Sequence, residues 1–275
     1  MLKRSLIVIL FLTALMSVRL TALAGSPAEA VFTLAVDAGH GGKDVGCRGK
    51  KQYEKNITLD VARRLRGLIE EAYGDSVAVV MTRDKDVFVP LADRAAKAND
   101  AQADLFISIH VNSLSYKAKN RASIHGASVY TVGLHKSEAN LNVAMRENSV
   151  IELEEDFTQA YHGFDPSSSE SYIIFELGQN RNMDRSIDFA SLAQQELTTT
   201  AGRYDKGVRQ AGFLVLWATR MPAVLVELDF ICNAQAEAFL GSDSGRQKCA
   251  QALFNAFAKY RQAHPASYMT SGTNE

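Results

Sequence analysis

The chain has 275 residues, of which 47% are hydrophobic and 22% are charged, which is enough for one sizeable globular core. Its 30 basic and 31 acidic side chains give a formal net charge of −1, which excludes the strongly basic surface of a typical nucleic-acid-binding protein. The three cysteines, Cys47, Cys232 and Cys249, allow at most one disulfide, so we expect free thiols without a functional role.

The first residues have the pattern of a secretory signal peptide. Lys3 and Arg4 precede a short apolar run at 6–18, and small residues follow it up to Ala24. We predict a signal peptide over 1–24; its removal takes away three of the 30 basic side chains and leaves a net charge of −4. The apolar run is too short for a good transmembrane helix, so no stable membrane span is expected after cleavage; an uncleaved anchor is the alternative.

From residue 31 onward, strand-like runs alternate with helical periodicity. Strands are predicted at 32–37, 77–82, 104–110, 127–132, 213–217 and 223–228, and helices at 56–73, 90–101 and 245–264. This alternation predicts a three-layer α/β fold with a largely parallel sheet, in a single domain over 31–264. The polar tail at 265–275 is predicted to be flexible.

One segment, residues 146–188, interrupts the alternation, and we call it the insert. It carries an acidic patch at 152–156 and a serine run at 167–169. Long insertions in compact domains are usually functional or mobile.

Four polar residues are predicted to meet at one edge of the sheet. His40 and His110 each end an apolar strand, and Glu227 closes another apolar run. Glu54 lies on the loop or first turn that leads into the helix after the first strand. Two histidines and one carboxylate form a known zinc set with a fourth position for water, and a second carboxylate can move the proton. The spacing alone does not decide which glutamate has which role.

These residues lie in motifs that resemble a known family. The motifs are 36–42 (VDAGHGG), 53–55 (YEK), 81–83 (MTR), 106–112 (FISIHVN), 210–213 (QAGF), 224–227 (VLVE) and 230–231 (FI). In this order, and over roughly 31–260, they resemble the N-acetylmuramoyl-L-alanine amidases, the zinc-dependent cell-wall hydrolases called amidase type 3.

The resemblance implies a mixed six-stranded sheet flanked by helices, and one catalytic zinc ion. His40, Glu54 and His110 would hold the metal, and Glu227 would be the catalytic carboxylate. The implied reaction cleaves the amide between N-acetylmuramic acid and L-alanine of the peptidoglycan stem peptide, in wall turnover or daughter-cell separation. Together with the signal peptide, it implies a secreted protein in the periplasm of a Gram-negative bacterium.

The chain departs from the family at a few positions. Ala38 replaces a common proline, while Leu228 and Cys232 replace common threonine and serine near Glu227. These changes leave the predicted metal site complete and affect the expected substrate contacts. A zinc peptidase acting within wall peptides, or a non-catalytic peptidoglycan-binding relative, are the alternative functions.

Some polar residues have weaker predicted roles. Asn112 and Gln210 are candidates for substrate contact or for orienting the site, although Asn112 can equally cap its loop. Arg94 is predicted to form a structural ion pair. His125, His135, His162 and His264 are predicted to be structural or solvated.

The insert is the candidate regulatory element. In some relatives an inserted helix lies across the cleft and places a glutamate on the zinc, and here Glu152, Glu154 and Glu155 are the candidates. We expect autoinhibition through one of them, relieved by an activator protein that moves the insert. A wall of the substrate groove or a solvated helix is the alternative.

Overall fold

Six strands form one sheet in the computed structural model, which describes residues 31–155, 157–173 and 182–266. The strands are β1 (Phe32–Ala38), β2 (Val77–Met81), β3 (Leu105–Asn112), β4 (Ala127–Val132), β5 (Asp205–Ala211) and β6 (Ala223–Phe230). Their order is β2-β1-β3-β6-β4-β5; the first four run parallel, β4 runs antiparallel to β6, and β5 is parallel to β4. The predicted mixed, mostly parallel sheet is confirmed. The predicted signal peptide and residues 267–275 lie outside the described residues.

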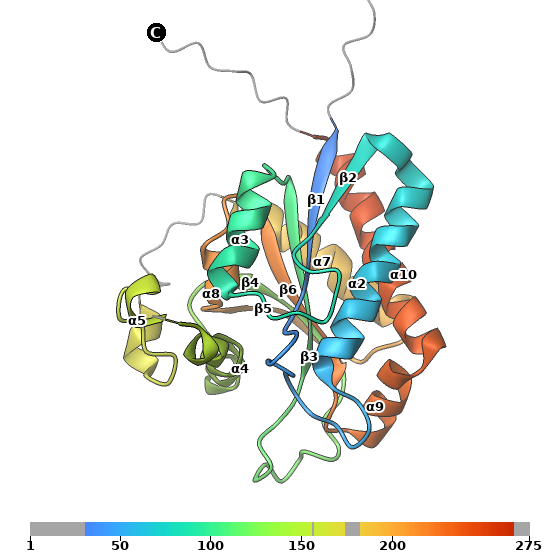
Figure 1. Ribbon diagram of the computed structural model, residues 1–275. Coiled ribbons are helices and arrows are strands. Elements are labelled where there is room, and N and C mark those ends of the chain that lie inside the picture. Colours follow the sequence, from blue (N-terminus) through green and yellow to red (C-terminus); the bar gives the residue numbers. More distant parts are fainter. Residues whose placement is uncertain (1–30, 156, 174–181, 267–275) are drawn as a thin grey trace, which may run out of the picture.

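Helices cover both faces of the sheet, which confirms the three-layer architecture (Figure 1). One face carries α2 (Glu54–Tyr73), α7 (Met183–Thr199) and α10 (Asp243–Ala263), and α9 (Ala234–Gly241) precedes α10. The other face carries α3 (Leu91–Asp100), α4 (Glu138–Asn148) and α8 (Leu214–Trp217). None of the helices in the described part of the chain is long and apolar enough to cross a membrane.

Alternation along the central strands divides the core between these two faces. Ile107 and Val224 pack into the layer of α2, α7 and α10, whereas Phe106 and Leu225 pack into the opposite layer. Each of these side chains is fully buried, and each such burial contributes about 2 kcal/mol before entropy is counted. Because both faces are buried, the strands read as continuous apolar runs in the sequence.

The strand predicted at 213–217 is wrong, and a different segment forms the fifth strand. Residues 214–217 form the short helix α8, and the fifth strand is β5, at the side of the sheet. Of its seven residues, four are intermediate in burial, two are exposed and one is buried. A short apolar run does not distinguish a buried strand from a buried helical turn. The polar sequence of an edge strand hides the period of two that would identify it.

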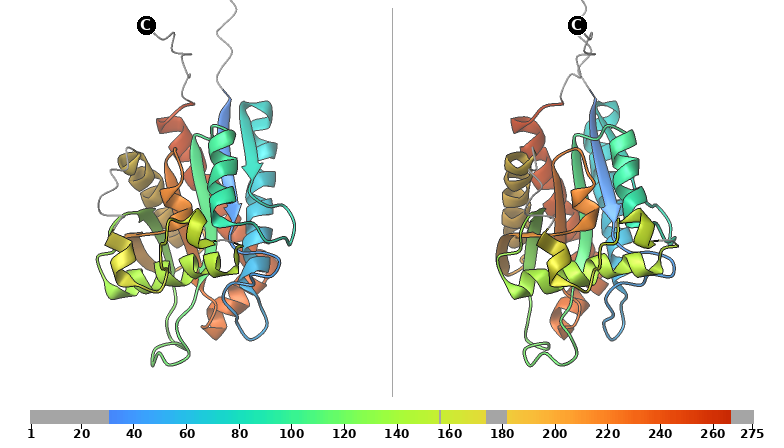
Figure 2. Two further views of the ribbon diagram at one scale, coloured as in Figure 1. Left: turned by 60° about the vertical axis from the view of Figure 1, so that its left-hand side comes forward. Right: turned by 90° about the vertical axis from the view of Figure 1, so that its left-hand side faces the viewer.

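The described parts of the insert, 146–155, 157–173 and 182–188, are folded against the domain (Figure 2). Its first residues form the last turn of α4, followed by the 3-10 helix η3 (Ser149–Leu153), α5 (Phe157–Ala160) and the 3-10 helix η4 (Ser169–Ile173). Ile151, Phe164 and Tyr172 are buried in the core layer that also holds α3 and α8. The remaining 3-10 helix, η2 (Gly74–Ser76), joins α2 to β2.

Candidate metal centre

Parallel pairing brings the predicted site residues to one edge of the sheet. His40 lies two residues after the end of β1, and His110 on β3 pairs in register with Glu227 on β6. Glu54 is the first residue of α2 and is fully buried. The structure therefore brings together all four residues that the sequence placed at this edge.

Two glycines make room for the side chains at this edge. A Cβ atom on Gly39 would lie 2.5 Å from two atoms of the His110 ring. Gly46 has a φ of +66°, and a Cβ there would lie 2.6 Å from Glu54 Oε2. Any larger residue at either position would displace a member of the cluster.

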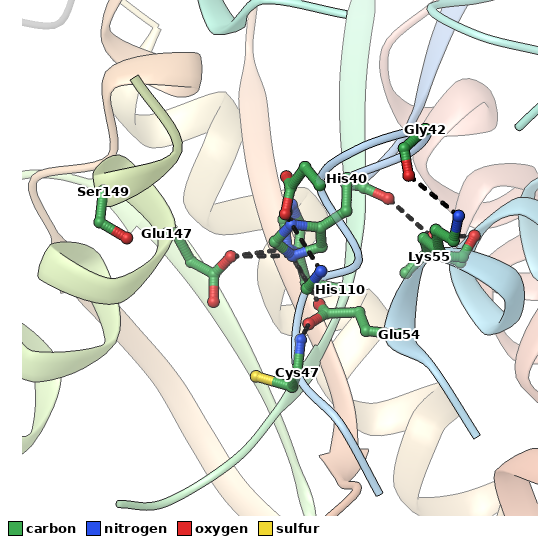
Figure 3. A network of polar contacts seen from close by, with 12 residues as sticks. His40, Gly42, Cys47, Glu54, Lys55, His110, Glu147 and Ser149 are labelled. Carbon is green, nitrogen blue, oxygen red and sulfur yellow. Dashed lines mark hydrogen bonds and ion pairs between the residues drawn. The ribbon is translucent and has the colours of Figure 1, made fainter. Parts of the chain in front are cut away.

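A second glutamate, Glu147, completes the group and comes from the insert (Figure 3). Glu54 Oε1 lies 3.1 Å from His40 Nε2 and 3.2 Å from His110 Nδ1. Glu147 Oε2 lies 3.2 Å and 3.1 Å from the same two nitrogens. All four side chains are buried, and their ligand atoms lie within 4.8 Å of one another.

This donor set fits a tetrahedral zinc ion. Zinc bonds of 2.0–2.1 Å in a tetrahedron place neighbouring ligand atoms about 3.4 Å apart, close to the separations above. His40 Nε2 and Glu147 Oε2 are buried without a hydrogen-bond partner among the described residues, so a cation would satisfy both. Asp44 Oδ2 lies 2.7 Å from His40 Nδ1 and orients the ring with Nε2 toward the cluster, as carboxylates commonly do for metal-binding histidines.

The electrostatics of the cluster favour a positive charge at its centre. Burial alone would lower the pKa of His40, but Glu54, Asp44 and Glu147 outweigh it and raise that pKa well above its usual range. Burial likewise opposes the shift at His110, where Glu147 and Glu54 raise the pKa to about 9. Without a metal the two carboxylates hold protons on the histidines, so metal binding releases protons from this site.

Glu227 lies beside the cluster, and only one of its two carboxylate oxygens has a partner among the described residues. Its Oε1 lies 3.3 Å from Arg146 Nη2, while Oε2 is buried with no hydrogen-bond partner in the described chain. Burial and the neighbouring Glu147 raise the pKa of Glu227 to about 8, against the opposing effect of Arg146. A carboxyl group with such a pKa can both accept and donate a proton near neutral pH.

The structure corrects which glutamate of the insert reaches the cluster. Glu147 does so from the last turn of α4, whereas Glu152 lies exposed at the cleft wall and Glu155 is exposed. Glu154 instead accepts hydrogen bonds from the backbone N–H of Leu91, at the start of α3, and from Tyr161 Oη. Glu152, Glu154 and Glu155 therefore make no contact with the two histidines among the described residues.

The other candidate residues stay outside the cluster. Asn112 Oδ1 accepts a hydrogen bond from the backbone N–H of Ser113, which is the capping role. Gln210 lies on β5, and because β4 and β5 run against the rest of the sheet, their carboxyl ends are at the opposite edge. The predicted ion pair of Arg94 is present, with Nη1 2.8 Å from Asp37 Oδ1. All three cysteines are free.

Sequence reasoning missed three residues of this centre: Asp44, Arg146 and Glu147. Asp44 stands four residues after His40, a spacing that is compatible with a partner but common by chance. Arg146 and Glu147 lie at the start of the insert, before the acidic patch at 152–156 that contains the predicted inhibitory residues. Only the packing of α4 against the sheet edge makes them part of the site.

A cleft of about 940 Å³ opens beside the cluster. One wall comes from the loop after β1 and from the loop at 113–126, which projects beyond the sheet (Figures 1 and 2). The other wall comes from α4 and η3 of the insert side. The cleft gives an extended substrate access to the metal centre from outside the domain.

Two histidines near the carboxyl ends of β1 and β3, with two carboxylates from α2 and α4 and an open cleft beside them, are the donor set of a metal-dependent hydrolase. The sequence model of the N-acetylmuramoyl-L-alanine amidase family matches residues 34–259, and the chain belongs to this family. It is 33% identical over 233 residues to the amidase AmiC of Escherichia coli O6:H1, covering 83% of this chain and 52% of AmiC. It is 29% identical over 228 residues to AmiA of Salmonella typhimurium, covering 82% and 74% of the two chains. The chain thus spans about half the length of the AmiC relative.

Solved amidase structures share the fold. The N-acetylmuramoyl-L-alanine amidase of Clostridium difficile 630 matches with a TM-score of 0.63 at 23% identity, over 85% of this chain and 98% of that one. The CwlD amidase of Clostridioides difficile, solved in complex with the GerS lipoprotein, matches with a TM-score of 0.60 at 21% identity, over 84% and 99%. The fold of the chain is that of an amidase catalytic domain.

Proposed function

We propose that the chain is a zinc-dependent peptidoglycan hydrolase that cleaves the amide between N-acetylmuramic acid and L-alanine of the stem peptide. The observation that carries this proposal is the buried His40–Glu54–His110 group, with Glu227 directly opposite His110 on the neighbouring strand. Membership of the amidase family supports the choice of bond.

The residues divide the chemistry between them. His40, Glu54 and His110 would hold the metal, and Asp44 keeps the His40 ring in its binding orientation. When bound, zinc supplies a Lewis acid that makes water nucleophilic near neutral pH. Glu227 takes the proton of the attacking water on its free Oε2 and passes it to the leaving amine, because its raised pKa suits both transfers.

Mass spectrometry of digested sacculi tests the bond that is cut. Free stem peptides that begin with L-alanine are expected; shortened peptides still attached to muramic acid would indicate a peptidase instead. Binding to sacculi without any product would indicate a non-catalytic relative. Glu227→Gln keeps the shape but cannot accept the proton, so the rate should fall by about 10²–10⁴-fold with metal content unchanged. Glu196→Gln, on α7 at a distance from the cluster, is the matched control.

The second part of the proposal is that the insert inhibits the resting enzyme through Glu147. Its Oε2 takes the fourth position around the two histidines, which an active site keeps open for water. An activator protein that moves the insert would free this position, and the complex of CwlD with a lipoprotein supports a partner of this kind. The two states need differ by only a few kcal/mol for such control.

Glu147→Ala tests the inhibition directly. The basal rate of stem-peptide release should rise about tenfold, while three ligands remain to hold the metal. Glu152→Ala is the control, since that carboxylate lies at the cleft wall and should leave the basal rate unchanged. An unchanged rate in a metal-loaded Glu147→Ala protein would contradict autoinhibition and favour a groove wall.

We propose further that the protein is secreted to the periplasm of a Gram-negative bacterium after removal of residues 1–24, where it acts in wall turnover or daughter-cell separation. Similarity to amidases of Escherichia coli and Salmonella typhimurium supports this location. Cell fractionation with N-terminal sequencing tests it: an N-terminus near Gly25 is expected, and a cytoplasmic chain that retains Met1 would contradict it.

A further inference from the structure

The cleft beside the metal cluster has a basic wall that the proposed hydrolysis does not use. Arg48 and Arg121 line it from two different loops. Neither forms an ion pair with a carboxylate within the described ranges of the chain. The third arginine of the cleft, Arg146, is already paired with Glu147 and Glu227.

Arg121 is held in a fixed orientation before any ligand arrives. Its Nη1 donates to Ser113 Oγ at 3.2 Å and also to the carbonyl oxygen of Leu114. The guanidinium lies 4.3 Å from the centroid of the Tyr116 ring. Since this side chain is partly buried and already ordered, binding a carboxylate costs it little conformational entropy.

A short chain of contacts joins Arg121 to the site of hydrolysis. The carbonyl oxygen of Ser113 accepts a hydrogen bond of 2.9 Å from Arg146 Nη1, and Arg146 contacts both Glu147 and Glu227. Only Ser113 therefore separates the guanidinium of Arg121 from the residues around the metal. Because His40, Glu147 and Arg121 line one cleft, a substrate with its amide at the cluster and its next groups along the cleft would pass Arg121.

Arg48 adds a second positive charge on the same side. Its guanidinium carbon lies 5.6 Å from the centroid of the Tyr53 ring, and the preceding residue, Cys47, donates its N–H to Glu54 Oε2. Arg48 is exposed, so solvent screens its contribution more than that of Arg121. The opposite wall carries the exposed Glu152. Its negative charge disfavours an acidic ligand group on that side and so favours the side of the arginines.

We propose that Arg121, assisted by Arg48, binds a carboxylate of the stem peptide and makes the cleft selective for stem peptides whose second residue carries a free acid rather than an amide. This inference rests on the proposed function, because it places the stem peptide in the cleft. A guanidinium and a carboxylate form paired, charge-assisted hydrogen bonds, which a neutral carboxamide cannot match.

Calorimetric titration of the zinc-loaded full chain with two synthetic peptides tests the proposal. The peptides are L-Ala-γ-D-Glu-L-Lys-amide and the same peptide with D-isoglutamine at the second position. The two peptides differ in one carboxylate only. Any contact between the metal and their shared N-terminal end therefore contributes equally to both affinities and cancels in their ratio. The wild type should bind the acid about tenfold more tightly than the amide, the usual size of a hydrogen bond to a charged group.

The variants assign this preference to particular residues. Arg121→Gln should remove the preference by weakening the binding of the acid peptide alone. Arg121→Lys should keep part of the preference, and Arg48→Gln should reduce it about twofold. Arg66→Gln is the matched control and should leave the preference intact, because Arg66 pairs with Glu70 on α2 and does not line the cleft. Equal binding of the two peptides to the wild type, no binding of either, or equal weakening of both by Arg121→Gln would overturn the inference.

Digestion of sacculi separates this inference from the proposed function. A wild-type protein that prefers the acid peptide but releases no stem peptide from sacculi would contradict the hydrolase proposal alone. One that releases stem peptides but binds acid and amide equally would contradict only the role of Arg121.

Discussion

Arg146 and Glu227 form an ion pair across the edge of the sheet, with Nη2 3.3 Å from Oε1. The same guanidinium nitrogen lies 2.8 Å from Glu147 Oε1. One side chain of the insert thus contacts both Glu147, which would cap the proposed metal position, and Glu227, which would move the proton. Burial opposes the charge on Arg146, but Cys47 and the carboxylates of Glu147 and Glu227 outweigh it and raise the pKa of Arg146 well above its usual value.

Replacing Arg146 should loosen the insert. In Arg146→Gln the carboxylates of Glu147 and Glu227 lose their shared counter-ion and repel each other, which favours release of α4 from the cluster. We expect basal release of stem peptides from sacculi to rise roughly tenfold, equivalent to about 1.4 kcal/mol. Arg209→Gln is the control, because Arg209 contacts α4 through Asn140 but not the metal centre. A metal-loaded Arg146→Gln protein with a lower rate than wild type would show that Arg146 assists catalysis instead.

Removing the metal should destabilise the domain. A ligand at about 1,000 times its dissociation constant stabilises the folded state by about 4 kcal/mol, which is roughly 10 °C of Tm for a domain of this size. Differential scanning fluorimetry with and without chelator measures the shift. His110→Ala should abolish the response to zinc, whereas His125→Ala, at an exposed position outside the cluster, should keep it. A Tm that is the same with zinc and with chelator would contradict the metal site.

Gly39 and Gly67 should respond to alanine in opposite ways. At Gly39 the new Cβ lies 2.5 Å from the His110 ring, so the ring must move and zinc affinity should fall at least tenfold. At Gly67, in the middle of α2, a Cβ meets nothing within 4 Å, so Gly67→Ala should stabilise the fold by roughly 0.5–1 kcal/mol. Zinc titration and urea unfolding of both variants measure these effects. Unchanged zinc affinity in Gly39→Ala would show that the ring tolerates displacement.

The buried Asp37 should make the domain sensitive to acid. Burial alone would raise its pKa, but Arg94 at 2.8 Å, with Ser108 and Thr82 as donors, lowers it from 3.8 to about 2. Because the folded pKa lies below the unfolded one, the stabilisation is present above about pH 4 and is lost as the pH falls toward 2, by about 2 kcal/mol.

Urea unfolding at pH 6 and pH 3 checks this effect of Asp37. The wild type should lose more stability between the two pH values than Asp37→Asn, which is the less stable protein at pH 6. Equal losses in the two proteins would assign the acid sensitivity to other groups.

Much of the fold could be predicted because each central strand is marked in the sequence by its own run of apolar residues. Three of the strands that meet at the metal edge are continuous apolar runs, since both faces of the sheet are covered. A strand was predicted where α8 forms, because a buried helical turn has the same apolar pattern as a short buried strand. The edge strand β5 was not predicted, because solvent exposure removes its apolar pattern.

The sequence by itself determined that His40, His110, Glu54 and Glu227 would gather at one edge, because parallel strands end together and each residue stands where an apolar run stops or a helix starts. It did not identify Glu147, Arg146 or Asp44. Their roles depend on how α4 lies against the sheet edge and how the glycine loop folds back on His40, and these are decided by packing between segments far apart in the chain. Only the tertiary structure therefore showed that Glu147 of the insert lies 3.1–3.2 Å from both histidines. It also showed that Arg48 and Arg121 line the cleft without a carboxylate partner among the described residues.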